Sequence, residues 1–487
     1  MNALGRLTTL LNTKPTSRNM TILFGVALFL RLIVFFFYMQ HNDRYKQGDT
    51  PDYHSCAVSM ANGRGMFVGG RPRFWRAPGY PFYLKQFYQL GDVKSYPLGD
   101  STTAQKMAIL IQILIVSLLP LVIFYLALLL TKTLAIAWIA SWISVFHIGI
   151  VLASSFLMTD IFGALLFYLY LICFYSSYAV IGEKGMKGTV WWRMIALAAV
   201  TLGIFTYIRP MGNYIWVVSM FLLLVFGNDI WSIKLKKFFL FTLIFFAITG
   251  PWYVRNYQLT GKWFFCPMWG LYFNTFVAPK VSQHIHGGTY EENWKKQVNL
   301  GNIEAMKVAQ SMRGSGYLSV PELDIGRAAW PLIMAHPFRA LHHWMGHVFI
   351  TLFDTYSNHH LVDLARGEPW EPLEPTLLSK FQDSLYREPM NWFMRMLSWL
   401  EFFFFIFTWI GILGGFITFM FMPLLKCFKV SDFYKQMAAL WLKVGPFIGA
   451  VCFMTGGYGY ARLRLPVDML IIILSLTFWY WLYDRKK

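Results

Sequence analysis

The chain has 487 residues, of which 56% are apolar and only 14% are charged, whereas about a quarter of the residues of a typical soluble protein are charged. This composition excludes an ordinary soluble globular protein, and the 19% of aromatic residues suits a membrane protein, because Trp and Tyr collect at membrane interfaces. The formal net charge of +19 does not indicate a nucleic-acid partner, since the basic residues lie in short clusters between apolar runs and in two polar loops. We expect membrane anchoring and an anionic lipid head group instead.

Ten segments are long and apolar enough to cross a membrane as helices, which takes about 20 residues each. They lie near residues 20–39, 107–130, 133–153, 157–178, 191–208, 211–227, 237–254, 398–424, 437–458 and 466–484. The sequence therefore predicts an all-α polytopic membrane protein with about ten transmembrane helices, folded as a single transmembrane domain over residues 1–487.

Basic residues cluster in the tail before the first span, in every second connection, and after the last span at Arg485-Lys486-Lys487. Cytoplasmic connections carry an excess of Lys and Arg, so these clusters predict that both termini are cytoplasmic. This topology requires an even number of spans, and ten satisfies it. We expect an integral multi-pass protein. Because no appended lumenal domain is apparent in the sequence, we expect by analogy that its membrane is a bacterial inner membrane.

The same topology places two long polar loops, residues 40–106 and 255–397, on the outer face. Loops of this length are usually functional. Within the second loop, residues 335–356 are moderately apolar but contain Pro337, Arg339 and several histidines. We interpret this segment as an interfacial helix that lies on the membrane; the alternative, an eleventh span, would place the basic clusters on both sides.

The common motifs of nucleotide and hydrolase chemistry are missing: the sequence has no Walker loop, no HExxH, no GxSxG and no Asp-x-Asp pair. Catalysis would therefore depend on isolated acids and arginines of the outer face. In the first loop, Asp49, Tyr53 and Ala57 recur every fourth residue and share one face of a helix. Asp49 is a candidate N-cap with Pro51 in the first turn, and a catalytic role is the alternative interpretation.

Beyond Ala57, the first loop continues with Gly63-Arg64-Gly65-Met66-Phe67 and then Pro78-Gly79-Tyr80-Pro81. This order resembles the first outer loop of the GT-C glycosyltransferases, in particular the bacterial branch similar to dolichyl-phosphate-mannose protein mannosyltransferases and the lipid A aminoarabinose transferase. Four later stretches match in the same order: Ser154 to Asp160, Ile208-Arg209-Pro210, Pro251 to Tyr257, and Ala461 to Pro466. In the last stretch Leu463 replaces the usual Tyr, which removes an expected ring contact but keeps both cations.

The resemblance covers nearly the whole chain and implies that Asp49 is the catalytic aspartate and Asp160 a second acid of the outer face. An acid one turn into a span is costly and usually functional, although Asp160 could also cap its helix. Arginines on the outer face are either snorkelling anchors or ligands of a phosphate, and we favour the second. The expected phosphate ligands are Arg76, Arg255, Arg462 and Arg464. The other expected substrate contacts are Tyr53, Tyr80, Arg209 and Asn256.

By this resemblance, we expect an inverting membrane glycosyltransferase with Asp49 as general base. It would move a sugar from a polyprenyl-phosphate donor to a hydroxyl of a glycan, lipid or protein acceptor of the cell envelope, at the periplasmic face. No metal ligands are predicted and no cofactor is required, although the scheme is compatible with a divalent cation. The alternatives are a transporter or lipid-linked-glycan flippase, and a non-catalytic scaffold. If the chain is an enzyme of this kind, we expect Asp49, Asp160, Arg76 and Arg255 to face one cavity.

Overall fold

The computed structural model of the chain describes residues 13–40, 46, 48–91, 93, 102–177, 188–227, 229–356, 392–421, 432–455 and 460–485. Almost all of this part is helical, and the predicted all-α fold is confirmed. One short antiparallel hairpin, in which β1 (Phe67–Val68) pairs with β2 (Arg71–Pro72), is the sheet structure of the described residues.

The first half of the chain forms the helices α2 (Ser17–Gln40), α3 (Thr50–Ala61), α4 (Gly79–Leu90), α5 (Thr103–Val116), α6 (Leu119–Thr131), α7 (Leu134–Phe146), α8 (Ile148–Ala153), α9 (Asp160–Ser176), α10 (Gly188–Ile208) and α11 (Gly212–Phe226). They are followed by α12 (Trp231–Thr260), α13 (Met268–Tyr272), the π-helix η1 (Phe273–Val277), α14 (Ala278–His286), α15 (Tyr290–Ser311), α16 (Pro321–Ala335), α17 (Pro337–Phe353), α20 (Trp392–Phe416), the π-helix η3 (Ile417–Phe421), α21 (Asp432–Met454) and α22 (Ala461–Asp484).

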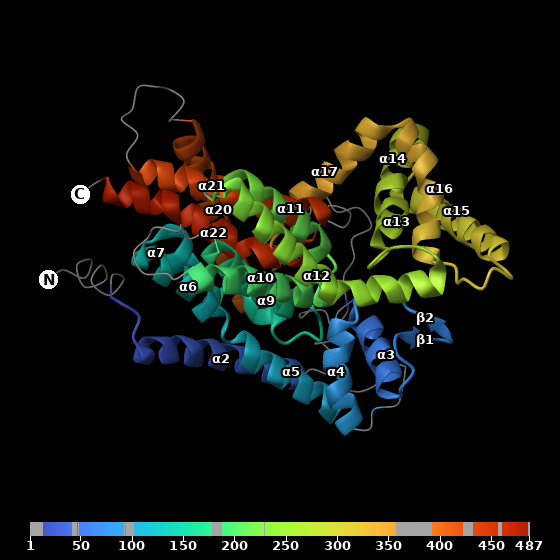
Figure 1. Cartoon of the computed structure of the whole chain (residues 1–487), viewed down its shortest axis with the longest axis horizontal. Coiled ribbons are helices and arrows are strands. Elements are labelled where there is room, and N and C mark those ends of the chain that lie inside the picture. The colour runs from blue at the N-terminus through green and yellow to red at the C-terminus, as the bar shows by residue number, and fades with distance from the viewer. Residues whose placement is uncertain are drawn as a thin grey trace.

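The elements of the two long loops gather at one end of the molecule (Figure 1). In the view of Figure 1 the hairpin, α3, α4 and α13–α16 lie on the right, whereas the first turn of α2 and the last turn of α22 lie on the left. The bundle of apolar helices separates these two ends. The loops that the sequence places on one face are therefore neighbours in space, on the side opposite the ends of the first and last helices.

Six helices are long and apolar enough to cross a membrane by length and composition: Ser17–Met39, Thr103–Thr131, Val190–Ile208, Trp392–Phe421, Tyr434–Met454 and Ala461–Asp484. Three shorter apolar helices are Leu134–Phe146, Asp160–Ser176 and Gly212–Phe226. The multi-pass membrane character is thus confirmed, while the number of ten spans and the cytoplasmic termini stay predictions. Several basic clusters of the predicted cytoplasmic connections lie outside the described residues, in 178–187 and 422–431.

Three helix boundaries differ from those of the expected spans. The span expected at 133–153 is broken at His147, whose extended backbone (φ −60°, ψ 115°) separates α7 from α8. The helix that contains the seventh expected span, α12, continues beyond residue 254 to Thr260. The last helix begins at Ala461, so Pro466 lies inside α22 and not at its start. Pro251 and Pro466 are both accommodated within long helices, where neighbouring helices or local adjustments compensate for the lost hydrogen bond.

The segment 335–356 contains α17, which starts at Pro337 as the fixed φ of proline favours. It is not among the helices that are long and apolar enough to span. It exposes Phe338 and Phe349 and buries Trp344. Its interfacial position stays a prediction.

Helix α22 forms the centre of the bundle, with nearly every side chain from Ala461 to Thr477 buried. It packs against α7, α9, α20 and α21. The approach of α20 is close: a Cβ on Gly411 would lie 2.1 Å from Ser475 Oγ, in keeping with small residues at membrane helix interfaces. Because α22 also begins beside the two loops, its first turn connects the bundle to the elements that carry the candidate site.

Candidate active site

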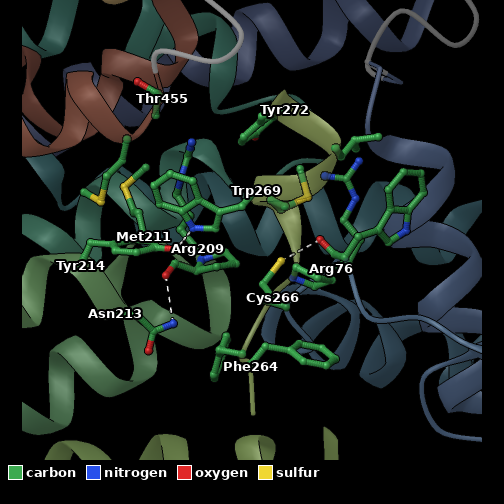
Figure 2. Close-up of a pocket in the computed structure, with 18 of the residues that line it drawn as sticks. Arg76, Arg209, Met211, Asn213, Tyr214, Phe264, Cys266, Trp269, Tyr272 and Thr455 are labelled. Carbon is green, nitrogen blue, oxygen red and sulfur yellow. Dashed lines mark hydrogen bonds between the residues drawn. The ribbon is translucent and has the colours of Figure 1, made fainter. Parts of the chain in front are cut away.

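A cavity of about 620 Å³ lies where the first loop, α9, the connection before α11, α13 and the first turn of α22 converge (Figure 2). Three guanidinium groups and two carboxylates are part of its wall, which leaves one net positive charge on those five groups. The charged residues are Asp49, Arg76, Asp160, Arg209 and Arg462. A partly apolar cavity with a few convergent charged groups is the usual form of a small-ligand site.

Asp49 stands at the N-cap position of α3 but makes no capping bond with its side chain. Its Oδ1 accepts a hydrogen bond from Arg76 Nη2 at 2.7 Å, and its Oδ2 accepts one from Arg462 Nη2 at 2.6 Å. Pro51 in the first turn lowers the need for a cap, because proline has no N–H to satisfy. The expected N-cap therefore describes the backbone position of Asp49, whereas its carboxylate joins the first loop to a residue 413 positions away.

The side chain of Arg76 is held on several sides. Besides Asp49, its Nη2 donates to Asp52 Oδ2 at 2.9 Å, and its guanidinium lies 5.3 Å from the ring centroids of both Tyr53 and Trp75. Such cation–π contacts and charge-assisted bonds reduce the freedom of a long side chain. Asp52 is thus a second anionic partner that helps to fix Arg76.

Burial alone would raise the pKa of Asp49, but the positive charges of Arg462 and Arg76 and their hydrogen bonds outweigh it and lower the pKa to about 2. The carboxylate is therefore ionised at every pH of ordinary activity. The pKa of the neighbouring Tyr53 is raised, first by its burial. Tyr53 is consequently a neutral phenol at the wall of the cavity.

Asp160 forms a second acid–arginine pair in the same cavity. Its Oδ1 accepts from Arg209 Nη1 at 2.7 Å, and the two residues are only 5% and 8% exposed. Asp160 is the first residue of α9, and Arg209 follows the end of α10, so their pair joins two helices at the end nearest the loops. A hydrogen bond of 3.3 Å between the hydroxyls of Tyr53 and Thr159 connects this pair with the surroundings of Asp49.

Aromatic side chains form much of the remaining wall. In the view of Figure 2, Arg76 and Arg209 lie on either side of Trp269, whose Nε1 donates to the hydroxyl of Tyr214. Trp269 also stacks against Trp344 of α17, with ring planes 5° apart. Flat apolar faces bordered by hydroxyl, amide and charged groups suit a ring that carries both C–H and O–H groups.

The structure brings six of the expected site residues together at the cavity: Asp49, Tyr53, Arg76, Asp160, Arg209 and Arg462. Arg255 is not among the residues that line it. Its guanidinium lies 4.3 Å from the ring of Trp252, and its Nη1 donates to Asn256 Oδ1 at 2.7 Å. Asn256 is fully buried and donates to the carbonyls of Phe264 and Phe265, so it fixes the turn after α12. The expectation that Arg255 faces the cavity was therefore wrong.

Tyr80 and Arg464 also lie away from the cavity. Tyr80 is fully buried behind Tyr53, at 5.4 Å between ring centroids, and donates to Gln112. Arg464 pairs with Asp468 at 2.5 Å on another side of α22. Two residues along an α-helix are about 200° apart, so the helical start at Ala461 turns Arg462 and Arg464 to opposite faces.

Several lining residues had no signal in the sequence. Trp269 and Tyr272 belong to a short helix without amphipathic periodicity, and Asn213 is an ordinary member of an apolar helix. Among the described residues no group of three or more His, Cys, Asp or Glu side chains is arranged to hold a metal ion. The histidines of α14 and α17, including His343, lie outside the cavity wall.

The described helices form an all-α polytopic membrane fold, in which the acid–arginine cavity lies beside the elements of the two loops. No protein-family model and no curated protein matches the chain. Among solved structures it is similar to the archaeal oligosaccharyltransferase AglB from Archaeoglobus fulgidus, in complex with an inhibitory peptide and a dolichol-phosphate, with a TM-score of 0.50 and 12% identity over 96% of this chain and 51% of that one.

A second structure of the Archaeoglobus fulgidus oligosaccharyltransferase, tethered with an acceptor peptide, has a TM-score of 0.49 and 14% identity over 96% of this chain and 50% of that one. ArnT from Cupriavidus metallidurans, bound to undecaprenyl phosphate, has a TM-score of 0.36 and 10% identity over 95% of this chain and 78% of that one. The archaeal oligosaccharyltransferase matched at a TM-score of 0.50 is a GT-C protein, so the predicted resemblance is confirmed in the fold. The chain spans about half the length of the archaeal enzyme.

The Asp160–Arg209 pair gives a stability prediction. Arg209→Gln leaves a buried carboxylate without its cation, which costs about 3 kcal/mol or more, so we expect a lowered thermal midpoint in detergent. Adding Asp160→Asn should recover part of the loss, because the unpaired charge is removed. Lys295→Gln, which breaks an exposed ion pair of α15, is the control and should not change the midpoint. A double variant less stable than Arg209→Gln alone would contradict the pairing.

Proposed function

We propose that the chain is a membrane glycosyltransferase that moves a sugar from a polyprenyl-phosphate donor to an acceptor hydroxyl. The observation that supports this most directly is the position of Asp49, an ionised carboxylate held by two arginines at the wall of a cavity that is partly lined by aromatic residues. A base, phosphate ligands and ring-binding surfaces are the groups that such a transfer requires.

The donor phosphate is assigned to Arg76 and Arg462. Guanidinium groups bind phosphate through paired hydrogen bonds, and the five charged groups of the wall carry one net positive charge. A phosphodiester carries one negative charge, so its binding neutralises the site. The archaeal oligosaccharyltransferase of similar fold is in complex with a dolichol-phosphate, which is also a long-chain lipid that carries a phosphate group.

In the proposed reaction Asp49 accepts the proton of the acceptor hydroxyl, whose oxygen attacks the anomeric carbon with inversion. The bond between this carbon and the phosphate oxygen breaks, and the polyprenyl phosphate leaves with the electron pair. Arg76 and Arg462 stabilise the negative charge that develops on it. Both arginines donate to Asp49 in this structure, so the arriving phosphate competes for them and makes the carboxylate more basic.

Asp160 is proposed to orient the sugar or the acceptor, and its charge is balanced by Arg209. Tyr53 is proposed to contact substrate through its neutral hydroxyl, which already bonds Thr159. The acceptor, whether glycan, lipid or protein, is proposed to approach from the loop side at the periplasmic face. The scheme requires no cofactor and is compatible with a divalent cation.

Asp49→Asn tests this proposal. The amide keeps the size of the side chain but does not accept a proton, so transfer of radiolabelled sugar from polyprenyl-phosphate donors should fall by at least about 100-fold. Glu291→Gln, on the exposed face of α15, should retain full transfer at matched expression. Unchanged transfer by Asp49→Asn would exclude it as the base. Movement of labelled lipid across the bilayer without transfer, by the wild type, would favour a flippase.

The pH dependence of transfer gives a second test. The pKa of Asp49 is about 2, and the base must be ionised, so kcat/KM of the wild type should have no acidic limb from Asp49 above about pH 4. In Arg462→Gln the effect of burial is opposed by Arg76 alone, so the pKa of Asp49 rises and an acidic limb should appear above about pH 4. Identical acidic limbs in both proteins would contradict the electrostatic role of Arg462.

A further inference from the structure

The C-terminal end of α17 and the N-terminal end of α22 meet through Arg464. Its Nη1 donates to the carbonyls of Thr351 at 3.0 Å and Asp354 at 3.1 Å, and also to that of Leu352. The last carbonyls of a helix have no partner within the helix, and a positive charge is favourable there. Arg464 therefore caps α17 from the side chain of another helix.

The same two helix ends are also joined in the other direction. Asp354 Oδ2 accepts a hydrogen bond from the N–H of Ala461, the first residue of α22, at 3.3 Å, while Oδ1 accepts from the N–H of Thr355 at 3.0 Å. Asp354 follows α17 directly and is only 1% exposed. Each helix thus supplies a side chain that satisfies the free backbone groups of the other.

Asp468 completes this set one turn further along α22. Its Oδ1 accepts from Arg464 Nε at 2.5 Å, and its Oδ2 accepts from the hydroxyl of Tyr356. Arg464 and Asp468 are 5% and 4% exposed. Buried charges are expensive, and replacing such a pair by apolar residues is often neutral or stabilising, so stability alone is a weak reason for this arrangement. We call Asp354, Tyr356, Arg464 and Asp468 the clamp.

The clamp acts on the turn of α22 that carries Arg462. Arg462 follows Ala461 directly, and its guanidinium reaches Asp49 on the face opposite to Arg464. A helix end is otherwise its least constrained part, because its first N–H groups have no intrahelical partner. Fixing Ala461 and Arg464 on one side therefore determines where the guanidinium of Arg462 lies on the other.

We propose that the clamp residues Asp354, Arg464 and Asp468 are positioning residues, which hold the first turn of α22 so that Arg462 meets Asp49 and the donor phosphate. None of the three lines the cavity, and they act through Arg462. Because α17 also contributes Trp344 to the cavity wall, the clamp fixes the aromatic wall and the phosphate ligand relative to each other. The kinetic part of this proposal rests on the proposed function.

Hydrogen exchange of the protein in lipid nanodiscs tests the clamp without any activity. In Asp354→Asn the side chain keeps one acceptor oxygen in place of two, so one of its two backbone bonds is lost. Amide exchange in residues 461–464 should become about tenfold faster. The matched control is Asp324→Asn. Asp324 is a fully buried residue of α16 that pairs with Lys262, and its substitution should leave the exchange of these amides unchanged. Wild-type exchange rates in Asp354→Asn would overturn the proposal.

A double-mutant cycle tests the consequence for transfer. We expect Asp354→Asn to lower kcat/KM by about tenfold in the wild type and to have no further effect in Arg462→Gln, because both changes disable the same group. Tyr356→Phe, which removes only the hydroxyl that bonds Asp468, should behave in the same way and keeps the cycle measurable if Asp354→Asn does not fold. If the losses of kcat/KM caused by Asp354→Asn and Arg462→Gln multiplied in the double variant, the role of Asp354 would be merely structural and the proposal would be overturned. Absence of transfer in the wild type would overturn the proposed function, whereas the exchange experiment would still decide on the clamp.

Discussion

The two hydrogen-bonded ion pairs of Asp49 are the interaction on which the architecture of the site depends. They hold the start of α3, the segment after the hairpin and the first turn of α22 at one point. The side chain of Asp49 is only 27% exposed, so these cations compensate its carboxylate for the water that it has lost. The surrounding contacts follow from this requirement: Asp52 and two aromatic rings fix Arg76, and the capping contacts between α17 and α22 lie directly behind Arg462.

The same cations make the site suitable for an anionic ligand. Asp160 and Arg209 neutralise each other, so the one excess positive charge of the wall lies with Arg76 and Arg462, which share the carboxylate of Asp49. A phosphate that binds there replaces the carboxylate of Asp49 as the anionic partner of the arginines. The charge that surrounds the arginines therefore changes little. The aromatic wall formed by Trp269, Tyr214 and their neighbours gives the cavity a shape and an apolar surface, while the charges give it a fixed orientation.

Much of this arrangement could be predicted from the sequence, and the exceptions have physical causes. Hydropathy identifies the helices, and the four-residue spacing places Asp49 and Tyr53 on one side of α3. Arg464 was misplaced because the last helix was expected to start at Pro466, whereas α22 begins at Ala461. Arg255 was misplaced because it was expected in the outer loop, whereas α12 continues to Thr260 and contains it. In each case the helical backbone fixes the direction in which the arginine side chain points, which a loop would not do. The break at His147 and the aromatic wall have no hydropathic signal, because both depend on contacts between distant segments.

The most direct test of the account is whether Arg76 and Arg462 bind the phosphate of a polyprenyl lipid. Native mass spectrometry of the purified protein would compare retention of a polyprenyl phosphate with that of the corresponding polyprenol. The account predicts that the wild type retains the phosphate form at least about tenfold better, that Arg76→Gln/Arg462→Gln loses this preference, and that Arg255→Gln, outside the cavity wall, keeps it. A double variant that still prefers the phosphate would contradict the account.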